Sequence, residues 1–156
     1  MLIALTLLAC IGAGTVGGIF FAFSAFVMKA LAELPAGHGI AAMQRINIVV
    51  LNPLFLGVFM GTTLLAGAAI VTALLGWNAS RSPLLLAAGM LYLGGTFFVT
   101  AAFNVPRNER LAGFDPQSAQ AAEYWIAYLR EWSFWNHLRS AASIASAACS
   151  AAALAV

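Results

Sequence analysis

The stretch Leu2–Leu31, LIALTLLACIGAGTVGGIFFAFSAFVMKAL, decides the fold class, because Lys29 is the single charged residue within it. A helix needs about 20 mainly apolar residues to cross the hydrocarbon core of a bilayer. Three more apolar stretches follow, so we expect an all-α integral membrane protein, a four-helix bundle. The expected helices cover residues 2–31, 41–75, 84–104 and 116–156, with the membrane part of the last at about 132–156.

The composition supports a single transmembrane domain over residues 1–156. Hydrophobic residues make up 63% of the chain and charged residues only 8%, whereas a soluble domain carries about 25% charged residues. The net charge of +2 is dispersed, which excludes the dense basic face that a nucleic acid needs. Glycines spaced four apart let helices approach closely. Such contacts form within one chain or between copies, so a homo-oligomer stays open.

Proline positions predict how the helices end and bend. Pro53 predicts a kink inside the second helix. Val105 precedes Pro106, which disfavours helix and predicts a break there. Asp115 followed by Pro116 predicts the cap and first residue of the fourth helix. That helix would be too long for the bilayer, so its first half is expected to be an amphipathic segment outside or along the membrane.

Basic residues predict the orientation of the chain. Most of them flank the first and third loops, with one in the second: Lys29 and Arg45, then Arg107, Arg110 and Arg130, against Arg81. By the positive-inside rule the first and third loops are cytoplasmic and both termini lie outside. We expect a bacterial inner membrane. Arginines that serve a binding site would produce the same bias.

Polar and aromatic side chains gather at one end of the expected bundle. Polar residues inside membrane helices are costly, so they invite a functional hypothesis. Each helix contributes a group at the end that carries the first and third loops, which predicts one polar, aromatic-lined cavity for a flat, largely apolar molecule. The groups are Ser24; Gln44 and Asn47; Thr96, Thr100, Asn104 and Asn108; and Trp125, Tyr128, Trp132, Trp135, Asn136 and Arg139.

Each of these groups also has a purely structural interpretation. Tryptophans and tyrosines form belts at membrane interfaces, and asparagines join helices. Arg139 needs a counter-charge, which Glu131, Glu123 or Glu109 could supply, so a salt bridge explains it as well as an anion site does.

The sequence predicts no metal or haem and no disulfide. His38 and His137 lack a second ligand at a helical spacing. Cys10 and Cys149 lie in the first and last apolar stretches, where a bond is conceivable, but buried lone thiols usually pack as small apolar residues.

Two motifs carry a resemblance to a known family. They are N-x-P-x-N at Asn104–Asn108 and W-x-x-W-N-x-x-R at Trp132–Arg139, supported by the segments Phe23–Met28 and Ala42–Asn47. Together they resemble the DUF1772, or anthrone oxygenase-like, family. That family includes fungal and bacterial proteins that oxidise anthrones to anthraquinones with molecular oxygen and no known cofactor, and many of its bacterial members have no assigned activity. The resemblance therefore implies a lipophilic aromatic substrate, molecular oxygen as co-substrate and no cofactor.

With this resemblance, our hypothesis is that a base forms an enolate that reacts with oxygen. It makes His137 the base and assigns Arg139 and Asn136 to the enolate oxygen. The other substrate-binding residues of the hypothesis are Asn104, Asn108, Trp125, Tyr128, Trp132, Trp135, Asn47, Gln44 and Ser24. One alternative is a non-catalytic membrane module that binds or passes on a lipophilic quinone or polyketide, and another is a structural or assembly protein.

Overall fold

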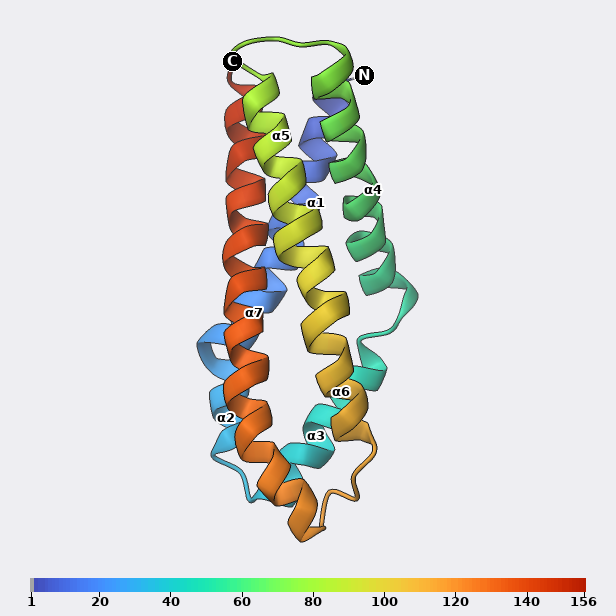
Figure 1. The fold of residues 1–156 in the computed structure, drawn as a ribbon, viewed down its shortest axis with the longest axis vertical. Helices are drawn as coiled ribbons and strands as arrows, with labels where there is room; N and C mark the ends of the chain where they lie inside the picture. Colours follow the sequence, from blue (N-terminus) through green and yellow to red (C-terminus); the bar gives the residue numbers. More distant parts are fainter. Residues whose placement is uncertain (1) are drawn as a thin grey trace.

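The computed structural model describes residues 2–156, and within this range it contains helices and short loops but no strand. The helices form four rods that run side by side, with both termini at one end (Figure 1). The first rod joins α1 (Leu2–Ala22), the π-helix η1 (Phe23–Val27) and α2 (Met28–Ala32); the second holds α3 (Ala36–Val49) and α4 (Pro53–Leu75); the third joins α5 (Ser82–Met90), the π-helices η2 (Leu91–Phe98) and η3 (Thr100–Asn104), and α6 (Val105–Ala112); the fourth is α7 (Ala119–Leu154).

Small residues bring the rods close to α7. A Cβ added at Gly17 of α1 would lie 3.0 Å from Ile144 Cγ1, and one added at Gly95 of η2 would overlap the Ala142 Cβ. Glycine at these two positions therefore lets α1 and η2 pack directly on α7. By contrast, Gly57 and Gly61 of α4 face open space, so their spacing serves no contact within the described chain.

The distribution of polarity is that expected in lipid. Large apolar side chains such as Ile3, Leu64 and Leu75 are exposed on the outside, whereas Thr96, Asn136 and most of the α7 serines are buried. In a soluble protein most large apolar side chains are buried and most polar side chains are exposed. Three helices are long and apolar enough to cross a membrane, and α7 is not among them: Leu2–Ala32, Pro53–Leu75 and Ser82–Ala112.

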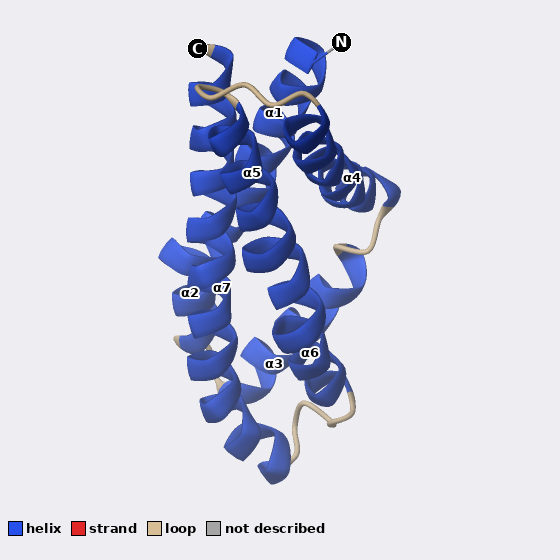
Figure 2. Ribbon diagram, turned by 45° about the horizontal axis from the view of Figure 1, so that its top comes forward, coloured by secondary structure: helices blue, strands red, loops and turns tan. Residues whose placement is uncertain are grey.

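The second rod is interrupted rather than kinked. Helix α3 ends at Val49 and α4 starts afresh at Pro53, so the prediction of one helix over 41–75 is wrong. Asn52 is the N-cap: its Oδ1 accepts a hydrogen bond from the Phe55 N–H at 3.0 Å, and Pro53 occupies the first helical position. Cap and proline together favour a helix start. Figure 2 shows this break as a loop beside the body of the bundle.

The third rod continues where a break was predicted. The helix passes through Val105 and Pro106 to Ala112, so the predicted break is wrong. In η3 the Val105 N–H bonds to Thr100 O, five residues back. This wider turn relieves the clash that proline makes with an α-helix. The Arg107 side chain also donates to Phe103 O at 2.8 Å, supplying a partner for a carbonyl near the proline.

The fourth rod begins later than predicted. Ser118, not Asp115, is the N-cap of α7, and its Oγ accepts a hydrogen bond from the Ala121 N–H at 3.1 Å. Asp115 instead closes a turn, since its Oδ1 accepts from the Gln117 N–H at 3.0 Å. Pro116 therefore lies in this turn and not in the helix.

Candidate functional site

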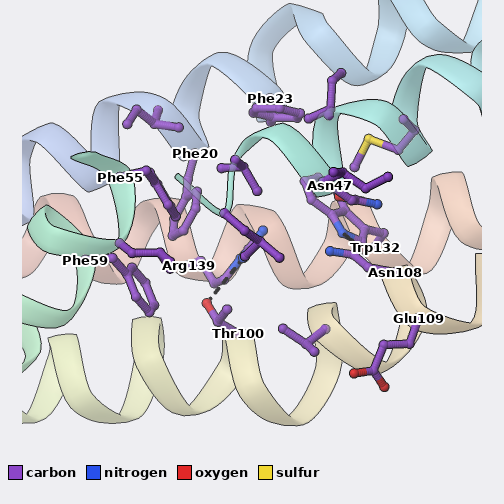
Figure 3. A pocket seen from close by; sticks show the side chains of 18 of the residues that line it. Phe20, Phe23, Asn47, Phe55, Phe59, Thr100, Asn108, Glu109, Trp132 and Arg139 are labelled. Atoms are coloured by element: carbon purple, nitrogen blue, oxygen red, sulfur yellow. Dashed lines mark hydrogen bonds between the residues drawn. The ribbon is translucent and has the colours of Figure 1, made fainter. Parts of the chain in front are cut away.

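A cavity of about 430 Å³ lies in the half of the bundle that carries the first and third loops. Its walls are mainly apolar, and five aromatic residues contribute to them: Phe20, Phe23, Phe55, Phe59 and Trp132 (Figure 3). Phe55 and Phe59 come from the first turns of α4 and stack at 5.8 Å between ring centres. The polar side chains of the lining are few, namely Gln44, Asn47, Thr100, Asn108, Glu109 and Arg139.

The exposed part of the cavity lining beside the α3–α4 break is apolar. Ile48 at the end of α3 and Leu51 in the α3–α4 loop line the cavity and are 62% and 64% exposed. Val105 of α6 also lines it and is exposed. The break between α3 and α4 therefore leaves a side opening, edged by apolar groups, toward the surroundings of the bundle.

Arg139 is the charged group of the interior. It is only 4% exposed. Its Nη1 donates to Thr100 Oγ1 at 3.2 Å (Figure 3), and its Nη2 donates to Asn136 Oδ1 at 2.7 Å. The guanidinium carbon lies 4.0 Å from the centre of the Phe20 ring and 5.2 Å from that of Trp132. Cation–π contacts of this kind stabilise a desolvated cation only in part.

No carboxylate of residues 2–156 pairs with Arg139. Glu131, one of the predicted partners, binds Arg107 instead, with 2.9 Å between Arg107 Nη2 and Glu131 Oε2. The Nε of Arg139 is buried and has no hydrogen-bond partner in the described chain. A buried charge normally has a partner, because desolvation is costly. The free N–H and the missing counter-charge would both be satisfied by a bound anion or oxyanion.

Asn136 holds Arg139 in place. Its Nδ2 donates to Phe20 O and to Ser24 Oγ, both at 2.8 Å. These two bonds turn the amide oxygen toward Arg139, which fixes the plane of the guanidinium. Neither Asn136 nor Ser24 lines the cavity, so both support the site from behind.

Further along the cavity, a second polar group surrounds Asn108. The Oδ1 of Asn108 accepts two hydrogen bonds at 2.8 Å, from the Tyr128 hydroxyl and from Trp132 Nε1. Burial raises the pKa of Tyr128, which keeps its hydroxyl a donor. Asn47 lies beside this group, and Gln44 Nε2 bonds to two backbone carbonyls, Leu111 O at 2.9 Å and Phe114 O at 3.0 Å.

Comparison with known proteins places this chain in a family. The sequence profile of the family described as anthrone oxygenase matches residues 54–149, more than half of the 156 residues. The chain belongs to the anthrone oxygenase family. No curated protein and no solved structure matches it. The matched region runs from α4 to most of α7 and contains Asn108 and Arg139, whereas Asn47 and Phe20 lie outside it.

In this anthrone oxygenase family member, the structure gathers five of the predicted site residues at the cavity: Gln44, Asn47, Asn108, Trp132 and Arg139. Asn104 is buried and donates to Trp132 O at 3.2 Å. Trp125 and Tyr128 belong to a core cluster beside the cavity. Trp135 stacks on Phe103 with 3.6 Å between ring centres and does not line the cavity.

His137, the predicted base, is exposed and is not among the lining residues. Successive residues of an α-helix are rotated by about 100°. Because Asn136 and Arg139 point inward, His137 points outward. Among residues 2–156 no three His, Cys, Asp or Glu side chains cluster as metal ligands would, and Cys10 and Cys149 are free thiols.

Sequence reasoning missed Phe55 and Phe59 of this family member and named Glu109 only as a counter-charge. The spacing of the two phenylalanines, four residues apart at the start of α4, was the available signal. It became informative only with the helix start at Pro53, since that start brings their common face to the cavity.

Proposed function

We propose that this protein is an integral-membrane four-helix bundle that oxidises a flat, anthrone-like substrate with molecular oxygen. The proposal rests mainly on one observation: the Nε of the buried Arg139 has no partner in the described chain and lies at the wall of a cavity with aromatic residues. Membership of the anthrone oxygenase family supports the reaction type. A volume of about 430 Å³ falls within the range of roughly 300–1,000 Å³ that is usual for small-molecule sites.

In this proposal α7 crosses the membrane enclosed by the three apolar rods. Its serines face those rods, as Ser143 Oγ does at 2.7 Å from Thr96 Oγ1 and Ser146 does with Ala88 O at 2.8 Å. Such bonds satisfy polar side chains away from lipid. The first and third loops are cytoplasmic, and the mouth at Ile48 and Leu51 opens sideways to hydrocarbon, so the substrate enters from the bilayer.

The proposed chemistry begins with loss of a proton from the methylene carbon opposite the ketone of the substrate. The electron pair delocalises onto the ketone oxygen, and the resulting enolate binds at Arg139. Oxygen takes electrons from the enolate and bonds to the former methylene carbon, giving a hydroperoxide once protonated. Loss of the second C–H proton and cleavage of the O–O bond release one water and leave the second carbonyl, so one substrate and one dioxygen give one quinone and one water.

Arg139 supplies most of the catalysis in this scheme. Its guanidinium is held by Thr100 and Asn136 before the substrate arrives, so no reorganisation is needed when negative charge develops. Preorganised donors of this kind act most strongly in a dry site. The enolate is favoured because its charge cancels the uncompensated charge of Arg139.

Glu109 replaces His137 as the proposed base. It is the carboxylate of the cavity lining and lies exposed in the middle of α6. Catalytic contacts in an empty site are often long and tighten only with substrate bound. Glu109 would take the methylene proton and pass it to solvent.

The test is quinone formation and oxygen uptake by purified, metal-stripped protein in detergent, with 1,8-dihydroxyanthrone and with spontaneous oxidation subtracted. We expect a rate above background that falls to background in Arg139→Ala. Saturable binding without oxygen uptake would instead identify a module that carries a lipophilic ligand and would refute the oxygenase proposal.

A further inference from the structure

The cavity has a second polar end, where one buried amide group has no partner among residues 2–156. The Nδ2 of Asn47 is buried and has no hydrogen-bond partner in the described residues, and Asn47 lines the cavity. The amide lies beside the Tyr128 hydroxyl, which donates to Asn108; no hydrogen bond of normal geometry joins that hydroxyl to Asn47 Nδ2. A buried donor left unpaired costs about 1–3 kcal/mol, which a ligand oxygen would recover.

Asn108 presents a second donor at the same end. Its Oδ1 is occupied by the Tyr128 hydroxyl and the Trp132 indole, so the orientation of the amide is fixed by two independent donors. Since the oxygen is occupied, Nδ2 is the group that Asn108 offers to a ligand in the cavity it lines. Both amides therefore have N–H groups that can donate to an acceptor oxygen of a ligand.

This amide end is separate from Arg139. Figure 3 shows Asn47 and Asn108 gathered at Trp132, while Arg139 and Thr100 lie further along the cavity. The Arg139 guanidinium carbon lies 5.2 Å from the centre of the Trp132 ring, and Trp132 Nε1 bonds to Asn108 at 2.8 Å, so this ring lies between the two ends. The Trp132 indole forms part of the wall between the two ends. A flat ligand that lies along this ring can therefore reach both ends with two of its oxygens.

We propose that Asn47 and Asn108 form a specificity-determining pair that binds a second oxygen of the ligand. This inference rests on the proposed function, in which the first oxygen binds Arg139. The ligand class is a flat fused aromatic with an accepting oxygen at the middle ring and another, a hydroxyl or carbonyl, on a terminal ring. A tricycle without the second oxygen fits the apolar walls but leaves both amides unpaired.

The experiment compares two stable probes, 9,10-anthraquinone and 2-hydroxyanthraquinone, which lack an oxidisable methylene. Dissociation constants are measured by quenching of tryptophan fluorescence in detergent. For each probe, the dissociation constant of the variant is divided by that of the wild type, which removes the effect of probe partition into micelles. Asn47→Leu keeps the side-chain size but has no donor. Losing one neutral hydrogen bond of about 1.4 kcal/mol weakens binding about tenfold. We expect that loss for 2-hydroxyanthraquinone and less than a twofold change for anthraquinone.

Leu56→Ala is the matched control, because Leu56 lines the cavity without a polar group; it should change both affinities by the same factor. Equal losses for both probes in Asn47→Leu, or no loss for either, would overturn the proposal. Should Asn47→Leu fail to fold by circular dichroism, Asn47→Ala gives the same comparison. Neither probe is oxidised, so this binding result does not depend on whether the protein is an oxygenase. Conversely, an active oxygenase that binds both probes with equal losses would refute the Asn47–Asn108 proposal alone.

Discussion

Replacing Arg139 by methionine should separate catalysis from stability in this protein. Methionine is flexible and apolar, so it fills much of the same space without charge or donors. Arg139 makes hydrogen bonds to Thr100 and Asn136 and none to a carboxylate. The substitution therefore removes the proposed oxyanion donor without exposing a buried acid.

The effect on turnover follows from the role of one preorganised donor. Removing such a donor lowers kcat by about 10²–10³, equivalent to about 2.7–4 kcal/mol in the barrier. Arg139 also carries the charge that offsets the enolate, so we expect the upper part of this range. The KM should change less than kcat, because the aromatic walls that hold the neutral substrate remain.

The effect on stability is the sum of two opposed terms. Asn136 Oδ1 loses its donor at 2.7 Å, and a buried acceptor without a partner costs about 1–3 kcal/mol. Removal of a buried, unpaired cation stabilises the variant by a comparable or larger amount, since the desolvation penalty of a buried ion is several kcal/mol. We therefore expect a Tm equal to or above that of the parent.

The assay combines oxygen uptake with 1,8-dihydroxyanthrone and thermal unfolding by circular dichroism in one detergent. Arg130→Met is the control, because Arg130 lies on the same helix with its side chain 81% exposed. The free energy of unfolding of this variant should stay within about 0.5 kcal/mol of the parent value. A lowered Tm with retained turnover in Arg139→Met would refute the reasoning, since Arg139 would then be a structural cation.

Three further predictions address other parts of the site. Glu109→Gln should lower kcat/KM for the hydroxyanthrone about 10²-fold or more; an unchanged kcat/KM would exclude Glu109 as the base. Leu51→Trp, at the mouth, should slow entry of substrate from vesicles and raise KM severalfold, whereas Leu54→Trp, on an exposed position that does not line the cavity, should not; equal effects would contradict a lateral entrance. Burial raises the pKa of Tyr128 above its ordinary 10.0, so the folded state holds the hydroxyl proton more tightly than the unfolded state. The contribution of this group to stability is therefore complete below pH 10 and is lost as the pH rises further. Tyr128→Phe should lower stability near neutral pH by about 1 kcal/mol, through loss of the bond to Asn108, and should flatten the alkaline decline in thermal unfolding; the same decline in the variant would assign it to other groups.

Local rules of sequence predicted well where one effect dominates. The length and apolarity of Leu2–Ala32 make it a membrane-span candidate whatever its neighbours are. A cap followed by proline is also a sound signal, but the chain contains it twice. Asn52–Pro53 starts a helix, whereas Asp115–Pro116 forms a turn in which the Asp115 side chain bonds to Gln117. Nothing in the two dipeptides distinguishes these outcomes, because the choice depends on what each segment packs against.

The sequence by itself determined the all-α class, the apolar rods and the family, because these depend on composition, run length and short motifs. The tertiary structure alone decided which polar groups meet. Spacing rules assume 3.6 residues per turn, but three π-helices shift the phase of the first and third rods. The direction of each side chain also depends on how its helix is rotated within the bundle, which turned His137 outward, set Asn136 behind Arg139 and brought Asn47 to the cavity beside Trp132.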